Sequence, residues 1–256
     1  MSGALEVAAI GMRAQQRALE VVAGNISNIN TPTYKRMDMR FAELIGHGPS
    51  DDVQASTVPG RDSVLGVFSW SLPSFDEQGR IDATGNATDI AIDGSGFIEL
   101  LGPAGTTRLW RGGTLRVMDD GALATSAGQL LKASITVPTD ASAIRIDGAG
   151  KVFVSQPGID GEAEIGRIEL VRVLDPTAIE RLDGGLYALR DDRGVLVGTP
   201  GEEGFGSIVQ GSMERSNVDL NAEMVTLLIA QRGYAANAQV ARAADEFYGI
   251  ANGLRR

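Results

Sequence analysis

The two ends of the chain carry apolar residues at a three-four spacing, and this feature constrains the fold more than any other. Near the N-terminus the spacing runs through residues 5–29 and is interrupted at Gln15. Near the C-terminus it runs through residues 220–248, with polar interruptions at Gln231 and Asp245. Such spacing places apolar side chains in one stripe along a helix and is typical of a coiled-coil seam. The sequence therefore predicts two long terminal helices that could pair; alternatively, each packs on a globular core.

The expected helices have recognisable ends. The first covers about residues 2–28, because Pro32 disfavours helix for the residue before it and favours a turn there. The last begins after Ser216 and Asp219, whose side-chain oxygens could cap the free N–H groups of a first turn, and extends to about Gly253. The expected seams consist of Leu5, Ala8, Met12, Leu19, Val22, Ile26 and Ile29 at one end and Leu220, Met224, Leu227, Tyr234, Ala238, Ala241 and Tyr248 at the other.

Composition divides the chain into four expected segments. Residues 1–45 hold the N-terminal coiled-coil helix and its exit motif, in which residues 35–45 could form a short helix or an extended arm. Residues 46–62 are rich in Gly, Pro, Ser and Asp and are typical of a flexible loop. Residues 63–213 form a β-rich middle domain, and residues 214–256 hold the C-terminal coiled-coil helix.

The middle segment contains short apolar runs joined by Asp-Gly turns, a pattern typical of antiparallel hairpins. No helix-length periodic segment separates the runs, so a parallel βαβ sheet is not expected. The predicted fold class is α+β, with long N- and C-terminal helices pairing as a coiled coil and a hairpin-built middle domain. The expected strands lie at residues 90–92, 97–100, 115–118, 144–146, 152–154, 186–189 and 195–197.

Negative charge is concentrated in the middle of the chain. The whole chain has a net charge of −10, whereas residues 1–45 and 214–256 each hold nearly equal numbers of basic and acidic residues. Nucleic-acid binding needs clustered Lys and Arg, so no nucleic-acid partner is expected. An acidic middle that meets water and near-neutral, apolar-striped ends that are buried would fit an assembled particle.

Neither membrane insertion nor a cleaved signal peptide is expected. No stretch approaches the roughly 18 uninterrupted apolar residues of a membrane span. The segment from Met1 to Glu6 lacks a basic region followed by an apolar run, so any export is expected to use a route other than the general secretory one. Cysteine is absent, which removes disulfide and thiolate chemistry.

The residue types that catalysis needs are sparse. His47 is the single histidine, and no Gly-x-Ser-x-Gly motif occurs. Zinc coordination lacks ligands, and no Asp-Gly turn has the spacing of an EF-hand. Glycine pairs at 94–96 and 148–150 precede no helix, so no dinucleotide site is indicated. We therefore expect no enzyme, no cofactor and no metal site; a paired-carboxylate glycosidase stays open because acidic residues are plentiful.

Three motifs give the chain a family resemblance. Residues 23–36, AGNISNINTPTYKR, resemble the signature of the bacterial flagellar rod and hook family, roughly A-N-N-[LI]-[AS]-N-x-[NS]-T-x-G-[FY]-K. Residues 87–97, ATDIAIDGSGF, resemble the family's segment that opens the middle domain, and residues 212–219, SMERSNVD, resemble the segment that leads into its terminal helix. The chain differs at Gly24, where the family usually has Asn, and at Thr33, where it often has Gly.

The resemblance implies a structural subunit of the flagellar rod that polymerises through paired terminal helices into the axial drive shaft of the basal body. Implied partners are further copies in a helical assembly, other rod and hook proteins, the flagellar type III export apparatus and the bushing ring proteins. The implied location is the rod, which crosses the periplasm. Length and residues 229–234 resemble the distal rod branch, with the proximal rod branch as the alternative. A secreted β-rich binding module and an enzyme acting on polysaccharide are the competing classes.

The residues expected to take part in subunit assembly come from the two seams and from the two motifs beside them. The asparagines place amide groups where a helix must stop, and such groups can satisfy backbone carbonyls or bridge to a neighbouring subunit. The expected residues are Leu5, Met12, Leu19, Val22, Asn25, Ile26, Asn28, Asn30, Thr31, Tyr34, Lys35, Ser216, Asn217, Val218, Leu220, Met224, Leu227 and Tyr234.

Overall fold

A computed structural model describes residues 2–46, 63–157, 161–190 and 194–253. The chain divides into two compact units. The helical unit comprises residues 1–27, 37–72 and 219–256, and the β unit comprises residues 28–36 and 73–218. Helices at both ends and a strand-rich middle confirm the α+β class. The expected loop at 46–62 lies almost entirely outside the described residues, as does His47.

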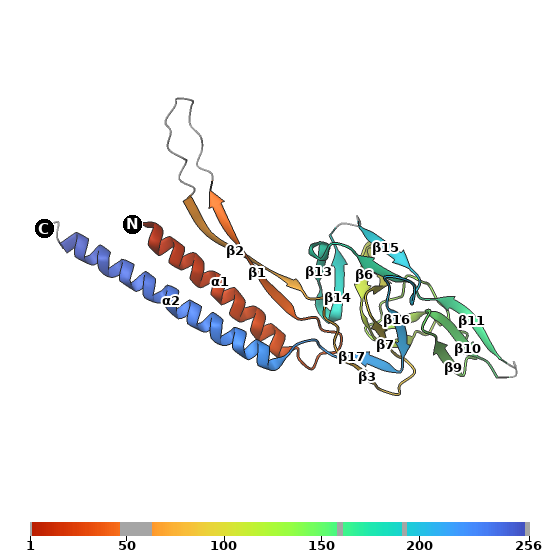
Figure 1. The fold of residues 1–256 in the computed structure, drawn as a ribbon. Coiled ribbons are helices and arrows are strands. Elements are labelled where there is room, and N and C mark those ends of the chain that lie inside the picture. Colours follow the sequence, from red (N-terminus) through yellow and green to blue (C-terminus); the bar gives the residue numbers. More distant parts are fainter. Residues whose placement is uncertain (1, 47–62, 158–160, 191–193, 254–256) are drawn as a thin grey trace, which may run out of the picture. The chain divides into compact units, whose positions relative to one another are not determined.

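The helical unit contains two helices and a pair of strands. Helix α1 spans Ser2–Ser27 and helix α2 spans Leu220–Gly253, and the two lie side by side and antiparallel (Figure 1). Strands β1, Met37–Gly46, and β2, Ser63–Pro73, pair with each other. Apolar Met37, Met39 and Phe41 alternate with charged residues, which favours a strand over the short helix that was one expectation for this segment. Strand β1 contacts α1, and Arg17 Nη1 donates to the Ser69 carbonyl oxygen over 3.4 Å.

The capped start of α2 is confirmed, with one difference. Asp219 Oδ1 accepts a hydrogen bond of 2.9 Å from the N–H of Ala222, which satisfies one of the free donors of the first turn. Ser216 does not reach the helix, because its Oγ accepts from the N–H of Val218 at 3.3 Å. The helix therefore has Asp219 as its N-cap, and Ser216 shapes the turn before it.

The contact between the helices uses small residues, and the expected seam on α2 is found in part. On α1 the buried residues include Ala8, Ala18 and Val22, of which Ala8 and Val22 were expected. On α2 the expected Leu227, Ala238, Ala241 and Tyr248 are half-buried, whereas the expected Leu220, Met224 and Tyr234 are 42%, 49% and 42% exposed. The observed stripe, which we call the inner seam, lets the helix backbones approach closely because most of its side chains are small. The inner seam of α2 consists of the buried or half-buried Glu223, Leu227, Ala230, Gly233, Asn237, Ala241, Ala244 and Tyr248.

Two glycines on facing helices make room for amide side chains. A Cβ at Gly11 of α1 would lie 2.8 Å from the amide atoms of Asn237, and a Cβ at Gly233 of α2 would lie 2.9 Å from Cδ of Gln15. Polar residues inside a helix contact help to fix its register. The interruption of the apolar pattern at Gln15 is thus a specific contact of the helix pair.

The β unit consists of antiparallel sheets joined by short loops. In its described part the largest sheet has the order β13 (Ile179–Arg181), β14 (Leu186–Leu189), β6 (Thr107–Trp110), β5 (Phe97–Leu101), β12 (Leu170–Val173), β15 (Val195–Gly198). A second sheet has the order β16 (Ser207–Gln210), β4 (Asp89–Asp93), β7 (Gly112–Val117), β8 (Leu123–Thr125). Smaller sheets are β11 (Glu162–Arg167), β10 (Lys151–Ser155), β9 (Ala143–Ile146), and β17 (Ser212–Glu214) with β3 (Ile81–Ala83). Short 3-10 turns lie at Pro103–Gly105, Pro176–Ala178 and Asp183–Gly185.

Every expected strand is found, although β7 ends at Val117, one residue before its expected end. The Asp-Gly turns, however, have two different roles. The turns after β7 and after β9 close hairpins, as predicted, because β7 pairs with β8 and β9 pairs with β10. The Asp93–Gly96 turn closes no hairpin: β4 pairs with β7 and β16, whereas β5 pairs with β6 and β12. Strands β14 and β15 are likewise not paired with each other. Gly94 adopts φ +110° and lies so close to Gly206 that a Cβ would meet its Cα at 2.9 Å, so this turn carries the chain between sheets.

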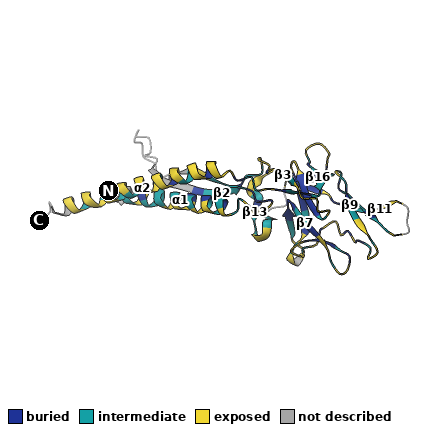
Figure 2. Cartoon of the chain, turned by 90° about the horizontal axis from the view of Figure 1, so that it is seen from below, coloured by how far each residue is buried: buried dark blue, intermediate teal, exposed yellow. Residues whose placement is uncertain are grey.

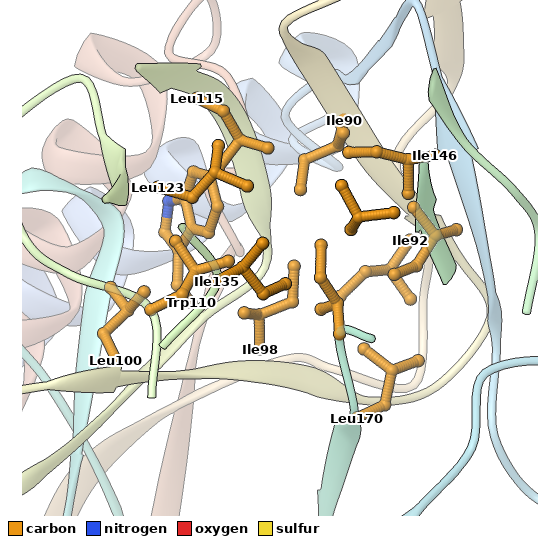
Figure 3. Packing of buried hydrophobic residues seen from close by; sticks show 14 of the residues in the cluster. Ile90, Ile92, Ile98, Leu100, Trp110, Leu115, Leu123, Ile135, Ile146 and Leu170 are labelled. Carbon is orange, nitrogen blue, oxygen red and sulfur yellow. The ribbon is translucent and has the colours of Figure 1, made fainter. Parts of the chain in front are cut away.

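The main core of the β unit is formed by side chains from several sheets (Figure 3). Ile90 and Ile92 from β4, Ile98 and Leu100 from β5, and Leu170 from β12 are at most 1% exposed. At roughly 1.5–3 kcal/mol for each large apolar side chain removed from water, this cluster is the main stabilising feature of the unit. The β unit thus has a core of its own, formed entirely by its own residues.

A second, aromatic cluster surrounds Tyr187, whose ring meets Phe75 and Phe97 edge to face at 5.2 and 5.7 Å. Burial raises the pKa of Tyr187 to about 12, from an ordinary value of 10.0. The folded state therefore holds this proton more tightly than the unfolded state, so its stabilising contribution is complete below pH 10. It is lost as the pH rises from 10 through 12, because the unfolded chain releases the proton first.

We expect the Tyr187→Phe variant to lose less stability than the wild type between pH 9 and pH 12, by about 2 kcal/mol. Denaturant unfolding at a series of pH values would measure the free energy of unfolding of both proteins. Other alkaline titrations, such as that of Lys35, occur in both proteins and cancel when one profile is subtracted from the other. Parallel pH profiles for the two proteins would contradict the expected role of Tyr187.

Candidate assembly site

The outward face of α2 carries a second apolar stripe, which we call the outer seam. Its residues follow spacings of three and four over most of the helix, and every one of them is exposed. Val225, Ile229, Val240, Phe247 and Ile250 are 50–66% exposed, and Figure 2 shows exposed positions along α2. Exposed apolar surface of this extent usually marks a binding site. The outer seam consists of Val225, Ile229, Arg232, Ala236, Val240, Ala243, Phe247 and Ile250.

The helix α2 therefore has two seams of the same period on different faces. The inner seam is covered by α1, and the outer seam is covered by no described residue of the chain. A helix that is apolar on more than one face is normally buried on more than one face. The outer seam is thus a candidate surface for contact with another polypeptide.

Asn25 fastens the end of α1 inside the helical unit. Its Oδ1 accepts from the N–H of Met37 at 2.9 Å, and its Nδ2 donates to the Met37 carbonyl at 3.0 Å and to Glu223 Oε2 at 3.3 Å. The amide thus pairs with β1 in the way a neighbouring strand would, and Asn25 and Glu223 are each 1% exposed. The expected role of asparagine at this helix end is realised within the chain.

Asn217 makes the corresponding contacts in the β unit. Its Oδ1 accepts from the N–H of Arg36 at 2.7 Å, and its Nδ2 donates to the carbonyls of Ser74 and Glu77 at 3.1 and 2.9 Å. The side chain thereby joins three backbone segments that are distant in sequence. Each of its polar atoms has a partner that only an amide in this orientation can satisfy.

We expect Asn217→Asp to lower the free energy of unfolding of the β unit by about 2–3 kcal/mol. The isosteric carboxylate loses two donors and faces two carbonyl oxygens instead. Denaturant unfolding followed by the buried Trp110 would measure the loss. Asn30→Asp, at an exposed position of the same unit, is the control and is expected to change stability by less than about 0.5 kcal/mol. Equal effects of the two variants would contradict this role.

A cluster of buried charged side chains connects the motif at residues 23–36 with the motif at residues 212–219. Glu214 is fully buried; its Oε1 accepts from Lys35 Nζ at 2.8 Å and from the N–H of Gly79 at 3.0 Å. Its Oε2 accepts from Arg111 Nη2 at 3.2 Å, and Arg111 Nη1 donates to the Gly96 carbonyl at 2.6 Å. Burial, and then repulsion from Arg111, lower the pKa of Lys35, while Glu214 opposes this shift. The cluster holds two cations around one carboxylate, away from water.

The turn before Lys35 contains an unusual backbone conformation at Thr33. Its φ is +58°, a left-handed value that disfavours β-branched residues, and it is the position where the family often has Gly. The N–H of Thr33 donates to the Glu214 carbonyl at 2.9 Å, and the side chain is 4% exposed. Thr33 thus adopts a backbone conformation that suits glycine, and its contacts with neighbouring residues stabilise this conformation.

The residues expected to take part in assembly fall into three groups. Several are buried within the chain, namely Val22, Asn25, Tyr34, Lys35 and Val218. Others are half-buried, namely Leu5, Met12, Leu19, Ile26, Asn28, Ser216, Asn217 and Leu227. The exposed ones, which remain available to another molecule, are Asn30, Thr31, Leu220, Met224 and Tyr234.

Sequence reasoning missed the outer seam and two members of the charge cluster. The outer seam was detectable, because residues 225–250 contain a second three-four spacing beside the first. Glu214 was part of a recognised motif, but its partner Arg111 is about 100 residues away and no local pattern marks it. Only the fold brings these residues together.

Neither metal binding nor membrane crossing is indicated by the described part of the chain. No group of three or more acidic, His or Cys side chains within it could hold a metal ion. Neither of its helices is long and apolar enough to cross a membrane. The described residues thus form an α+β protein whose terminal helix displays an extended, largely apolar surface.

Three protein-family models match successive segments of the chain. Residues 5–35 match "Flagella basal body rod protein", residues 91–154 match "Flagellar hook protein FlgE/F/G D1 domain", and residues 209–254 match "Flagellar basal body rod FlgEFG protein C-terminal". The flagellar basal-body rod protein FlgG of Borreliella burgdorferi is 33% identical over the full length of both chains. The FlgG of Caulobacter vibrioides is 34% identical, covering 98% of this chain and 99% of its own. The flagellar hook protein FlgE of Brucella abortus is 36% identical over 50% of this chain and 30% of its own.

These matches cover both helices and the β unit. The chain belongs to the bacterial flagellar rod and hook family.

Proposed function

We propose that the chain is a structural subunit of the flagellar rod, in its distal part, and that it polymerises through its terminal helices into the axial shaft of the basal body. The rod proteins FlgG are similar over the full length, which supports rod over hook. The observation that carries the mechanism is the outer seam of α2, an apolar surface that the described chain leaves exposed. The expected seam residues Leu220, Met224 and Tyr234 are also exposed, but on a different face of α2, and they stay proposed for other contacts in the rod.

Assembly through this surface is energetically favourable because the seam is rich in large apolar side chains. Each such side chain contributes roughly 1.5–3 kcal/mol when it is removed from water. The inner seam, in contrast, consists mostly of small or polar residues, so the helix pair gains little from its own contact. We propose that the helices form a stable coiled coil when they dock on neighbouring subunits, where the additional burial offsets the entropy lost on ordering.

The proposed partners follow from membership of the family. They are further copies of this chain, other rod and hook proteins, the flagellar type III export apparatus and the bushing ring proteins around the rod. The proposed location is the rod in the basal body, reached without a cleaved signal peptide. The helices and the turn motifs are proposed as assembly elements, with no catalytic role.

Quantitative peptide mass spectrometry on purified hook–basal bodies tests this proposal. Tens of copies of the chain per basal body, in a stable ratio to known rod and hook components, are the expected result. The ratio separates a distal rod subunit from a proximal one. Absence of the chain from the particles would overturn the proposal and favour a secreted β-rich binding module.

A further inference from the structure

We propose that the outer seam of one copy docks into a groove that α1, α2 and β1 of the next copy form together. This inference rests on the proposed function and adds to it the identity of the acceptor surface. The groove has a volume of about 370 Å³ and belongs entirely to the helical unit. Its lining consists of Val7, Ile10, Gly11, Ala14, Gln15, Phe41 and Asn237.

The shape of the groove suits a helix that approaches with large side chains. Its floor contains Ala14, a small buried residue over which another helix can come close. Its walls include Val7 and Phe41, which are 49% and 50% exposed although they are large and apolar. A second copy is the occupant that fits this groove, because the chain itself carries a matching apolar stripe with projecting residues such as Phe247.

The groove and the outer seam match in period as well as in polarity. Val7 and Ala14 of the groove lie seven residues apart on α1, and Val240 and Phe247 of the outer seam lie seven residues apart on α2. Two helices whose contact residues repeat every seven positions can interdigitate along their length. The exposed face of α1 beside the groove is polar, with Glu6, Arg13 and Gln16, so the groove is where α1 offers apolar contact.

The contact joins different surfaces of the two copies. Asn237 at the edge of the groove belongs to the inner seam of α2, whereas the outer seam lies on another face of the same helix. A contact between non-identical surfaces leaves one seam and one groove free at the ends of every assembly, so addition of copies continues. Pairing of two outer seams would instead produce a closed dimer and leave the groove empty.

Cysteine cross-linking tests the pairing directly, because the chain contains no cysteine of its own. Cells lacking the native gene would co-express a Val7→Cys chain with either a Val240→Cys or a Phe247→Cys chain, each with a different tag. Basal bodies would be oxidised, and the linked residues identified by mass spectrometry. Gln16→Cys, on the polar face of α1, replaces Val7→Cys in the control mixture.

The expected result is a doubly tagged species of twice the chain mass that links residue 7 to residue 240 or 247. The Gln16→Cys control mixture is expected to give no such species. Links between two copies of residue 247 alone, or incorporated chains with no link to residue 7, would overturn this inference. If Val7→Cys chains are not incorporated, Ile10→Cys tests the same groove under the same criteria. Absence of the unaltered chain from basal bodies would overturn the proposed function instead.

Discussion

Glu214→Gln should lower the free energy of unfolding of the β unit by about 3–5 kcal/mol, because it leaves two buried cations without their carboxylate. The neutral amide cannot replace it in either orientation. A glutamine side chain has one acceptor atom and one donor atom in place of two acceptors. Its donor would face either Arg111 or the Lys35 and Gly79 donors, all of which now donate to Glu214 oxygens over 2.8–3.2 Å. Denaturant unfolding followed by Trp110 fluorescence, in a Trp70→Phe background, would measure the loss.

A surface pair in the same unit provides the matched control. Glu99 accepts from Lys132 at 3.0 Å, but the Lys132 side chain is 50% exposed, so Glu99→Gln is expected to cost less than about 1 kcal/mol. If Glu214→Gln cost no more than this control, the buried cluster would contribute little to stability. Replacing all three charges together, with Lys35→Met, Arg111→Met and Glu214→Leu, would then separate charge from packing, since well-packed apolar replacements of buried ion clusters are often nearly neutral.

Ile229→Asp should prevent incorporation of the chain into the rod while leaving the isolated chain folded. Ile229 is 65% exposed in the single chain, so the substitution removes no internal contact and is expected to change stability by less than about 0.5 kcal/mol. In the proposed assembly, however, the same position would bury an unpaired carboxylate between helices, at a cost of several kcal/mol for each contact. Peptide mass spectrometry of basal bodies and swimming assays would detect the loss.

Gln231→Asp is the control, because it adds the same charge to an exposed position of α2 that lies outside the inner and outer seams and already carries a polar side chain. We expect it to be incorporated normally. Leu227→Asp, on the inner seam, is expected to disturb the helix pair itself as well as incorporation. Normal incorporation of Ile229→Asp chains would show that the outer seam takes no part in assembly.

The sequence by itself determined the two terminal helices, the β-rich middle and the family. Long three-four spacing specifies helices locally, and Pro32 and Asp219 mark their ends through backbone geometry and capping that need no distant partner. The expected strands were found for the same reason: short apolar runs between Asp-Gly turns are local signals. The three motifs are also contiguous in sequence, so they could be recognised without a structure.

Tertiary structure decided which surfaces meet. The apolar pattern of α2 is compatible with several faces, and the small residues at Gly11 and Gly233 selected the face that packs on α1, leaving the larger side chains outside. The turn at Asp93–Gly96 looked like a hairpin, but each flanking strand found its hydrogen-bond partners in a different sheet. Lys35, Arg111 and Glu214 come from three distant segments. Because contacts between distant residues depend on how all the elements pack together, no local pattern could have revealed them.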